Sequence, residues 1–474
     1  MAIDDIVDVN DLWMAYMDDL SRFDEIYDYV HELKGLPSLP EDADAEIRSI
    51  RNMCYKNILI LVRDTFVSSL SVVGYSTADS DEQSEGWDLW QQNGMDSRQS
   101  EIWTPAVTYG ASYVTMFIED GKVIYSPRSP RQMVAGYEDP QNDLFPTEVL
   151  EIWHERLGSK WIRRGALWDD KNVTPLDLGI ATDRTEFSKD IRARQDGDPV
   201  PHGFSIDGGY APVVRFVNRR DSEDHVIGEL EPLLKPQRAI NEVNFDRLIV
   251  SRWGAFPQKV ISGWSGTTTE VRAASARKLW TFSDPEVKAT TLEAADLNQY
   301  NDMLNEMLRH VARTAQISPA VVADAIQNIS ADALAAAERD QTRKVYAMQE
   351  SFGESVELML RESNRALGRT VSEDSEVNWR DNETRTFAGI VDGITKLVQA
   401  GVPVEDLLFM MPGMTQQRIQ SIGSKVKAQK ALERQQQMAQ INAARLRSPE
   451  AEQATQQGIT RDNPAQRNSG TEER

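Results

Sequence analysis

The stretch FDRLIVSRWGAFPQKVISG, residues 245–263, begins with the apolar spacing of a helix and stops within a few residues. Gly254 fits a helix C-terminus, and Pro257 cannot continue a helix. The residues that follow Pro257 read as a short strand. The sequence therefore predicts a helix from Gln237 to Trp253. Its apolar band is too broad for a lone surface helix, so we expect it to be covered on more than one side.

A second helix is predicted over residues 293–317, where apolar side chains follow a 3,4 spacing. Residues 257–292, between the two helices, read as a short strand, a Gly/Ser/Thr turn, a small basic helix and a second strand-like piece. Two helical rods thus bracket a compact βα module. A helical hairpin inside an ordinary domain, with short secondary-structure elements in the loop between its helices, fits the same pattern.

The composition limits the classes of function. The chain has 474 residues, of which 40% are apolar, enough for two to four domains with real cores. With 75 acidic and 52 basic side chains the net charge is -23, which argues against a sequence-independent grip on DNA. The single cysteine, Cys54, excludes an internal disulfide framework and a zinc site of several thiolates. We expect a soluble protein of a reducing cytoplasm, because no export signal is recognisable and the longest apolar run, ILILV at 58–62, is too short to span a membrane.

The rest of the chain indicates a mixed α+β fold. Helices are predicted over residues 9–33 and about 41–71, and short β-rich runs, among them AVTYGASYVTMFI at 106–118, fill residues 102–230. A helix of about 36 residues is predicted to begin after Ser330, as N-cap, and to end at Leu367. Gly353 is a candidate bend in this long helix. Its expected apolar face consists of Leu334, Tyr346, Met348, Phe352, Val356, Met359 and Leu360.

Charge is distributed unevenly between the ends of the chain. Residues 1–100 hold 21 acidic and 7 basic side chains, whereas residues 424–474 hold 9 basic and 6 acidic ones. The C-terminal segment begins as a basic, Gln/Ala-rich helical stretch and loses apolar periodicity from about Ser448, which is typical of a disordered tail. A solvated tail and a specific binding arm are both compatible with this pattern.

Catalytic motifs are weak. The five histidines, His31, His154, His202, His225 and His310, show no metal-binding spacing, so we expect surface or satisfied polar roles for them. GWSGTTTE lacks the lysine of a phosphate-binding loop, so the chain is not expected to be an ATPase. SDPEVK at 283–288 is the best candidate for catalysis, because Asp284 and Glu286 could hold magnesium while Lys288 assists an attacking water.

The order and spacing of several strings resemble the portal, or head-to-tail connector, proteins of tailed bacteriophages. The strings span roughly residues 10–425: TYGASYV (108–114), SPRQMVAGYEDP (129–140), APVVRFVNR (211–219), INEVNFDRLIVSRWGAFPQKVISG (240–263), NISADALAAAE (328–338) and VNWRDNETRTFAGIVDGITKLVQAGVP (377–403). The resemblance implies a non-enzymatic ring, typically a dodecamer, at one capsid vertex, through which DNA is packaged and ejected. It implies no cofactor, no metal and no membrane.

The resemblance also assigns the segments of the chain to the parts of a portal. They are residues 1–230, wing; 231–256 and 293–317, stem helices; 257–292, clip; 318–330, tunnel loop; 331–385, long helix and wing return; 386–423, crown; and 424–474, basic then disordered tail. The implied partners are other copies of the chain, the terminase large subunit, head-tail adaptors, the major capsid or scaffolding protein, and double-stranded DNA in transit. The implied location is the virion, after assembly in the host cytoplasm.

Three groups of candidate functional residues follow. The tunnel loop contributes Val321, Val322, Asp324, Gln327 and Asn328, the clip contributes Lys259, Arg272, Arg277 and Lys278, and stem packing involves Leu248, Trp253, Leu304, Met307, Leu308 and Val311. The tunnel loop has no Lys or Arg, which suits a surface that DNA must pass without being retained. A metal-dependent nuclease of the packaging apparatus, centred on SDPEVK, and another capsid or baseplate structural protein are the alternatives.

Overall fold

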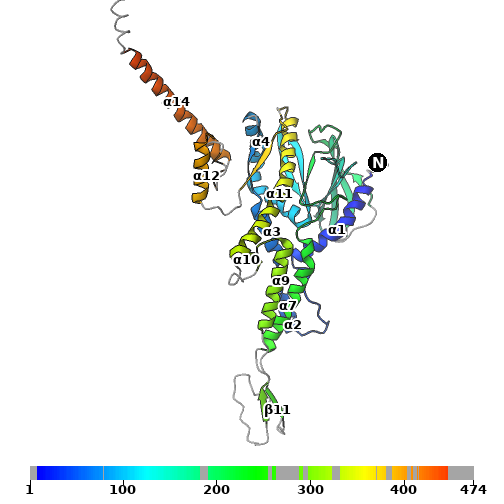
Figure 1. The fold of residues 1–474 in the computed structure, drawn as a ribbon. Helices are drawn as coiled ribbons and strands as arrows, with labels where there is room; N and C mark the ends of the chain where they lie inside the picture. The colour runs from blue at the N-terminus through cyan, green and yellow to red at the C-terminus, as the bar shows by residue number, and fades with distance from the viewer. Residues whose placement is uncertain are drawn as a thin grey trace, which may run out of the picture. The chain divides into compact units, whose positions relative to one another are not determined.

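The computed structural model describes most of the chain. It covers residues 8–77, 80–181, 191–254, 259–262, 288–291, 297–322, 331–369, 371–380, 387–402, 407–408, 411, 414 and 416–446. The chain divides into two compact units, Met1–Glu383 and Thr384–Arg474, which are treated separately below. The first unit is the mixed α and β structure that the sequence predicts (Figure 1).

Three helices open the first unit: α1 (Asn10–Val30), α2 (Ala45–Met53) and α3 (Ile58–Ser69). The expected apolar stripe of α1 is confirmed, because residues from Leu12 to Val30 at helical spacing are buried. The single helix predicted over 41–71 is wrong, since the chain leaves the helix at Cys54 and starts another after Asn57. Asn57 caps the new helix by accepting a 3.2 Å hydrogen bond from the nitrogen of Ile60.

Three further helices precede the sheets: α4 (Ser80–Gln92), α5 (Met95–Arg98) and α6 (Ser100–Tyr109). The expected strand over 106–118 is therefore wrong at its start, because residues 106–109 belong to α6. Gly110 ends α6 with φ of +99°, a left-handed conformation that glycine adopts without strain. The strand β2 begins directly after it, at Ala111.

The strands of the first unit form two main antiparallel sheets. The smaller has the order β10-β2-β3, and the larger has the order β4-β5-β6-β7-β8 with β9 paired to β7. Their bounds are β2 (Ala111–Glu119), β3 (Lys122–Arg128), β4 (Met133–Gly136), β5 (Glu148–Leu157), β6 (Lys160–Trp168), β7 (Asn172–Ala181), β8 (Arg194–Gln195), β9 (Val200–Pro201) and β10 (Val213–Val217). β1 (Val72–Ser76) pairs separately with β13 (Glu376–Trp379), 300 residues later in the chain.

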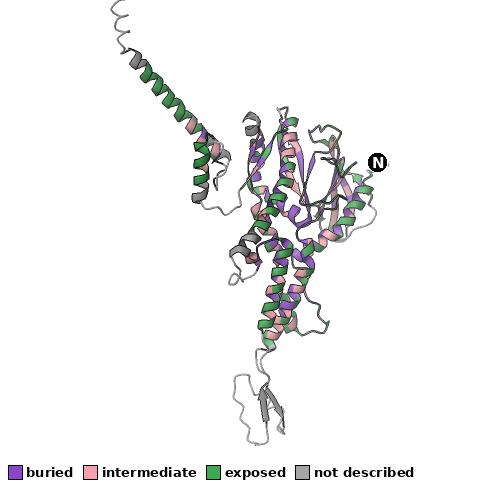
Figure 2. Ribbon diagram, viewed as in Figure 1, coloured by how far each residue is buried: buried purple, intermediate pink, exposed green. Residues whose placement is uncertain are grey.

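The core lies between the helices and the smaller sheet. Its largest cluster joins α1, α3, α6, β2, β3 and β10 with the helices of the C-terminal part of the unit, and aromatic rings fill its centre. Trp103 stacks on Phe352 with ring centroids 5.2 Å apart and meets Phe216 edge-on at 5.8 Å. A separate cluster packs the N-terminal half of α1 on the larger sheet. Figure 2 shows the buried residues concentrated along these contacts.

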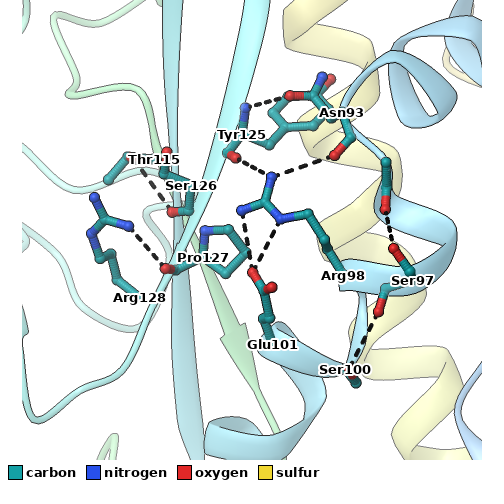
Figure 3. Close-up of polar contacts among 11 residues, drawn as sticks. Asn93, Ser97, Arg98, Ser100, Glu101, Thr115, Tyr125, Ser126, Pro127 and Arg128 are labelled. Carbon is teal, nitrogen blue, oxygen red and sulfur yellow. Dashed lines mark hydrogen bonds and ion pairs between the residues drawn. The ribbon is translucent and has the colours of Figure 1, made fainter.

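A polar clasp fastens the helices α4 to α6 to the edge strand β3 (Figure 3). Asn93 accepts a 2.8 Å hydrogen bond from the nitrogen of Tyr125 and donates one of 3.0 Å to the carbonyl of Val123. Arg98 donates to the carbonyls of Asn93 and Tyr125, and its charge is paired with Glu101. The edge of β3 is thereby covered, so its backbone groups are not left for another chain to pair with.

The long helix α11 (Ala331–Ala366) has the 36 residues that the sequence predicts, and Ser330, its expected N-cap, lies outside the described residues. Most of its expected apolar face is confirmed: Met348, Phe352, Val356, Met359 and Leu360 are buried. Tyr346 was wrongly placed on that face, because its side chain is 42% exposed and the neighbouring Val345 is the buried one. Gly353 packs beside β13, since an added Cβ would lie 3.4 Å from the indole nitrogen of Trp379.

The second unit is helical where it is described. It contains α12 (Phe387–Gln399) and α14 (Gln416–Leu446), and α14 is exposed along most of its described length (Figure 2). Ser448 and the tail beyond it lie outside the described residues. Throughout the described part of the chain, every helix is too short or too polar to span a bilayer.

Candidate functional site: the paired helices and their junction with the sheets

Two helices, α7 (Leu234–Gly254) and α9 (Asn298–Ala315), run side by side (Figure 1). They confirm the two helices predicted from the sequence, with α7 beginning three residues earlier than expected. The guanidinium of Arg247 on α7 donates a 3.1 Å hydrogen bond to the side chain of Asn301 on α9. The two helices also share the main core, which contains Ile240 and Val243 of α7 with Leu304 and Leu308 of α9.

The predicted stem-packing residues occupy different environments. Leu304, Leu308 and Val311 of α9 are buried in the main core of this one chain, and Met307 is half-buried against it. Leu248 of α7 is half-buried as well. Trp253 lies in α7, but its side chain is outside the described positions. The chain thus buries one face of α9 by itself. The half-buried side chains Met307 and Leu248 still expose part of their apolar surface to solvent.

That free apolar surface includes two exposed methionines. Met303 of α9 is 49% exposed, and Met53 at the end of α2 is 65% exposed. Met53 and Leu248 line a cavity of 590 Å³ between α2 and α7. The adjoining rim carries an ion pair of 2.7 Å between Glu46 and Arg252. An apolar patch with a charged rim is the usual composition of a surface that another protein covers.

A ladder of buried amides on α7 holds the break between α2 and α3. Gln237, Asn241 and Asn244, at helical spacing, are each less than 4% exposed. Gln237 and Asn241 bond the backbone of Lys56 from both sides, and Asn244 donates a 2.6 Å hydrogen bond to the carbonyl of Cys54. Apolar spacing alone does not reveal these three residues. Three amides at i, i+4 and i+7 in an apolar helix were the available signal.

A buried ion pair joins the helix pair to the rest of the unit. The ammonium of Lys344 on α11 contacts the carboxylate of Glu229, just before α7, and donates a 2.9 Å hydrogen bond to the carbonyl of Ala315 at the end of α9. Glu229 also accepts a 2.9 Å hydrogen bond from Asn218. Burial lowers the pKa of Lys344, and the charge of Glu229 opposes that shift. One salt bridge therefore links α7, α9, α11 and the end of β10, and no sequence motif indicated it.

The predicted clip is described only at its base. β11 (Lys259–Ser262) pairs antiparallel with β12 (Lys288–Thr291), which confirms the two strands expected there, and Lys259 lies opposite Thr291. Arg272, Arg277 and Lys278 lie outside the described residues. So does SDPEVK, apart from its last residue, Lys288.

The predicted tunnel loop begins with a short helix, α10 (Pro319–Val322). Val322 is buried, and Val321 is half-buried against the main core. Asp324, Gln327 and Asn328 lie outside the described residues. The two valines therefore anchor the start of this segment to α3, α9 and α11.

His202 has the satisfied polar role that the sequence predicts for it. His202 is buried, its Nδ1 accepts a 3.1 Å hydrogen bond from the nitrogen of Phe204, and its Nε2 lies 3.2 Å from the carbonyl of Asp169. These contacts satisfy the neutral ring, and burial lowers its pKa. Within the described ranges, no three His, Cys, Asp or Glu side chains are arranged to hold a metal ion.

Paired helices with partly uncovered apolar surface, carried on a mixed core, are features of proteins that assemble with others. Comparison with known proteins agrees with this class. Residues 65–441 match the family model described as phage portal protein, SPP1 Gp6-like, and the chain belongs to this family.

Two relatives illustrate the similarity. The chain is 26% identical over 364 residues to the portal protein of Mycobacterium phage L5, covering 71% of each chain. It is 27% identical over 363 residues to the portal protein of Mycobacterium phage D29, again covering 71% of each chain. These comparisons lend no support to the nuclease alternative.

Proposed function

We propose that copies of this chain form a ring at one capsid vertex, through which double-stranded DNA enters during packaging and leaves during ejection. Membership of the phage portal family carries the proposal. The uncovered apolar side chains Met53 and Met303 support it, because neighbouring copies in a ring would cover them. A dodecamer is the stoichiometry that the family resemblance implies.

In this proposal residues 1–230 and 331–385 form most of the wing, α7 and α9 form the stem, and residues 257–292 form the clip. Residues 318–330 are the tunnel loop, 386–423 the crown, and 424–474 a tail. The chain acts without catalysis of its own. It is a virion component, assembled in the host cytoplasm together with the major capsid or scaffolding protein.

The clip is proposed as the docking surface for the terminase large subunit and later for head-tail adaptors. Lys259, Arg272, Arg277 and Lys278 form a local basic group in a chain whose net charge is -23. Such a group steers an acidic partner toward the clip and fixes its orientation. Stem packing between copies would use Leu248 and Met307, the two candidates that are half-buried in the single chain.

The tunnel loop is proposed to face the DNA through Asp324, Gln327 and Asn328, with Val321 and Val322 at its anchored end. A protein surface along which DNA moves should carry few Lys or Arg side chains. Each phosphate that such a side chain neutralises raises the affinity for DNA and makes the binding more dependent on salt. The loop residues 318–330 contain no Lys or Arg and a single acid, Asp324. This composition allows the duplex to pass without being retained.

The first test is the mass of the purified assembly. A ring of the 53.5 kDa chain is expected by native mass spectrometry, with a mass near twelve times that of one copy. A species that stays monomeric at every concentration, in the presence of scaffolding protein as well, would overturn the proposed function.

The second test changes the charge of the loop. Asp324→Lys combined with Gln327→Lys places two cations per copy around the channel, so DNA packaged per procapsid should fall and partly recover as salt is raised. Asp324→Asn with Gln327→Asn is the matched control without added cations. Identical packaging curves for wild type and the lysine variant, with intact rings in both, would exclude this loop from the DNA path.

A further inference from the structure

A polar pocket lies on the first unit, and its lining residues come from outside the paired helices. It has a volume of 470 Å³ and lies between the end of β10, the middle of α11 and the loop 137–144. Four arginines line it: Arg215, Arg219, Arg220 and Arg361. Such a concentration of guanidinium groups is unusual in a chain with 23 more acidic than basic side chains, and nothing in the proposed channel function uses it.

The four arginines differ in whether a carboxylate pairs with them. Arg215 and Arg220 share the carboxylate of Asp224, at 3.3 and 3.5 Å. Arg219 and Arg361, by contrast, have no acidic side chain within 4 Å among the residues that the structure describes. The pocket therefore presents guanidinium groups that no carboxylate pairs with at 4 Å or less among the described residues, although the charges of Arg361 and Glu357 act on each other.

The wall carboxylates do not supply the missing partner. Asp143 lines the pocket, but its oxygens accept hydrogen bonds from the hydroxyl of Tyr210 at 3.2 Å and from the nitrogen of Asp139 at 2.8 Å. Glu354 is the other acid in the wall, and it is exposed. Both acids repel an anionic ligand, and they repel a doubly charged phosphate monoester more strongly than a single carboxylate, so the carboxylate fits the pocket better.

Two serine hydroxyls fix the walls of the pocket, and two arginine nitrogens near them are without an acceptor among the described residues. The hydroxyl of Ser351 donates to the carbonyl of Val217 at 2.6 Å, and that of Ser355 donates to the carbonyl of Arg215 at 3.1 Å, which locks α11 against β10. The Nε atoms of Arg215 and Arg361 are buried and have no hydrogen-bond partner among the residues that the structure describes. Buried donors without an acceptor are costly. An arriving carboxylate would make charge-assisted hydrogen bonds with the terminal NH groups of Arg219 and Arg361.

The rim of the pocket has the composition of a protein interface. Leu144 is 70% exposed at its edge, and Tyr137 and Leu358 form part of its wall. Arginine and tyrosine beside exposed apolar side chains are the residues enriched where proteins bind one another. The occupant should therefore be an acidic side chain on a folded protein surface. With 75 acidic residues per copy, another copy of this chain offers such side chains at the highest local concentration.

We propose that this pocket receives an aspartate or glutamate side chain from a second copy of the chain, and so forms a polar contact between neighbouring wings. The inference rests on the proposed ring, which it deepens by naming one of its contact surfaces. Arg361 and Arg219 bind the carboxylate, and Arg215, paired with Asp224, adds positive charge to the wall. The contact is distinct from the apolar packing of the stem.

Cross-linking tests the contact directly. Arg219→Lys and Arg361→Lys keep the charge and let a carbodiimide couple the introduced amine to a carboxylate in contact with it. Rings are assembled from a mixture of isotopically heavy and light chains, and the cross-linked peptides are identified by mass spectrometry. We expect peptides that join a heavy chain to a light one through the introduced lysine. Coupling only within one chain, to Asp143 or Glu354, would overturn the inference.

Charge reversal gives an independent measure. Arg219→Glu with Arg361→Glu should weaken self-association at least about tenfold and lower the salt concentration at which rings dissociate. Arg343→Glu is the control, because Arg343 lies on the same helix outside the pocket and its side chain is 83% exposed. Circular dichroism of the variants checks that each chain is folded.

The outcomes separate the inference from the proposed function. If rings of wild type and of Arg219→Glu with Arg361→Glu dissociate at the same salt concentration, the pocket contact is overturned. The portal function would then still stand. Wild-type chains that form no ring under any condition would overturn both. Should the Arg361 substitutions prevent folding, Arg219→Lys and Arg219→Glu, at an exposed position, decide the question alone.

Discussion

The side chain of Asn241 accepts a 3.0 Å hydrogen bond from the backbone nitrogen of Lys56, although 185 residues separate the two in the chain. Gln237, one helical turn earlier, donates to the carbonyl of the same Lys56. Both polar groups of that one residue are thus held by the helix α7. Because the chain turns here between α2 and α3, α7 determines where the second helix ends and the third begins.

Removing Asn241 should open this connection. Asn241→Ala leaves the nitrogen of Lys56 and the carbonyl of Gly35 without their partner, and we expect a loss of about 1–3 kcal/mol in the free energy of unfolding. Cys54, next to the connection, is buried, and burial raises the pKa of its thiol to about 11. Its alkylation by iodoacetamide should be slow in wild type and faster in the variant.

The control for that experiment is Arg238→Ala, on the same turn of α7. Arg238 is exposed and pairs only with its helix neighbour Glu242, so neither stability nor the alkylation of Cys54 should change appreciably. Equal alkylation rates for Asn241→Ala and wild type would show that the connection is held by apolar packing instead.

The effects of substituting Lys344 and Glu229 on the free energy of unfolding should be coupled, because the two side chains form one salt bridge. Lys344→Met leaves the buried carboxylate of Glu229 without its counter-charge, and we expect a loss of about 3–5 kcal/mol in urea unfolding. Adding Glu229→Gln removes that charge and keeps an acceptor for Asn218, so the double variant should regain most of the loss. Equal stabilities for the single and double variants would contradict this coupling.

The stability of the first unit should also depend on Glu357. Burial raises the pKa of this carboxyl above its usual 4.5, and the negative charges of Glu354 and Glu376 raise it further. A hydrogen bond from the nitrogen of Val377 and the positive charge of Arg361 lower the pKa and so oppose the shift. A raised folded-state pKa means that the folded chain holds the proton more tightly. The contribution of Glu357 to stability is therefore fully present below pH 4.5 and is lost as pH rises through the folded pKa.

Glu357→Gln removes this penalty and keeps an acceptor for Val377. We expect a higher melting temperature than wild type at pH 7 and a difference that shrinks toward zero as pH is lowered to about 4.5. Glu350→Gln, at an exposed position of the same helix, is the matched control. A constant difference at all pH values would show that the effect is one of packing and not of charge.

The two faces of α9 should respond differently to substitution. Leu308 is buried within its own chain, so Leu308→Ala should cost about 2–5 kcal/mol and lower the melting temperature of the isolated chain. Met303 is exposed, so Met303→Asp should leave that melting temperature unchanged and reduce the fraction of chains found in rings by native mass spectrometry. Full ring formation by Met303→Asp would place this face of the stem outside the contact between copies.

Elements with long-range periodicity could be predicted from the sequence. The helix α11 has the expected length, and α1, α7 and α9 lie where apolar spacing placed them. Periodicity succeeds there because a helix that buries one face repeats its apolar residues every three or four positions. The strings that indicated a phage portal also agreed with the family match, since they span most of the chain.

Breaks and polar contacts depended on the tertiary structure. The apolar run around residues 58–62 gave no sign that the helix ends at Cys54, because the cause lies in amides of α7 almost two hundred residues later. Tyr346 carried the same apolar signal as Val345, and only the packing of α11 showed which of the two is buried.

The sequence by itself determined the long helices and the family, because these are carried by apolar spacing and by ordered strings of residues. Only the tertiary structure decided which polar groups meet. The pair Lys344–Glu229 and the four arginines around one pocket come from segments far apart in the chain. Charges and amides have no periodicity that reveals their partners, and their energies depend on burial, which exists only after the chain has folded.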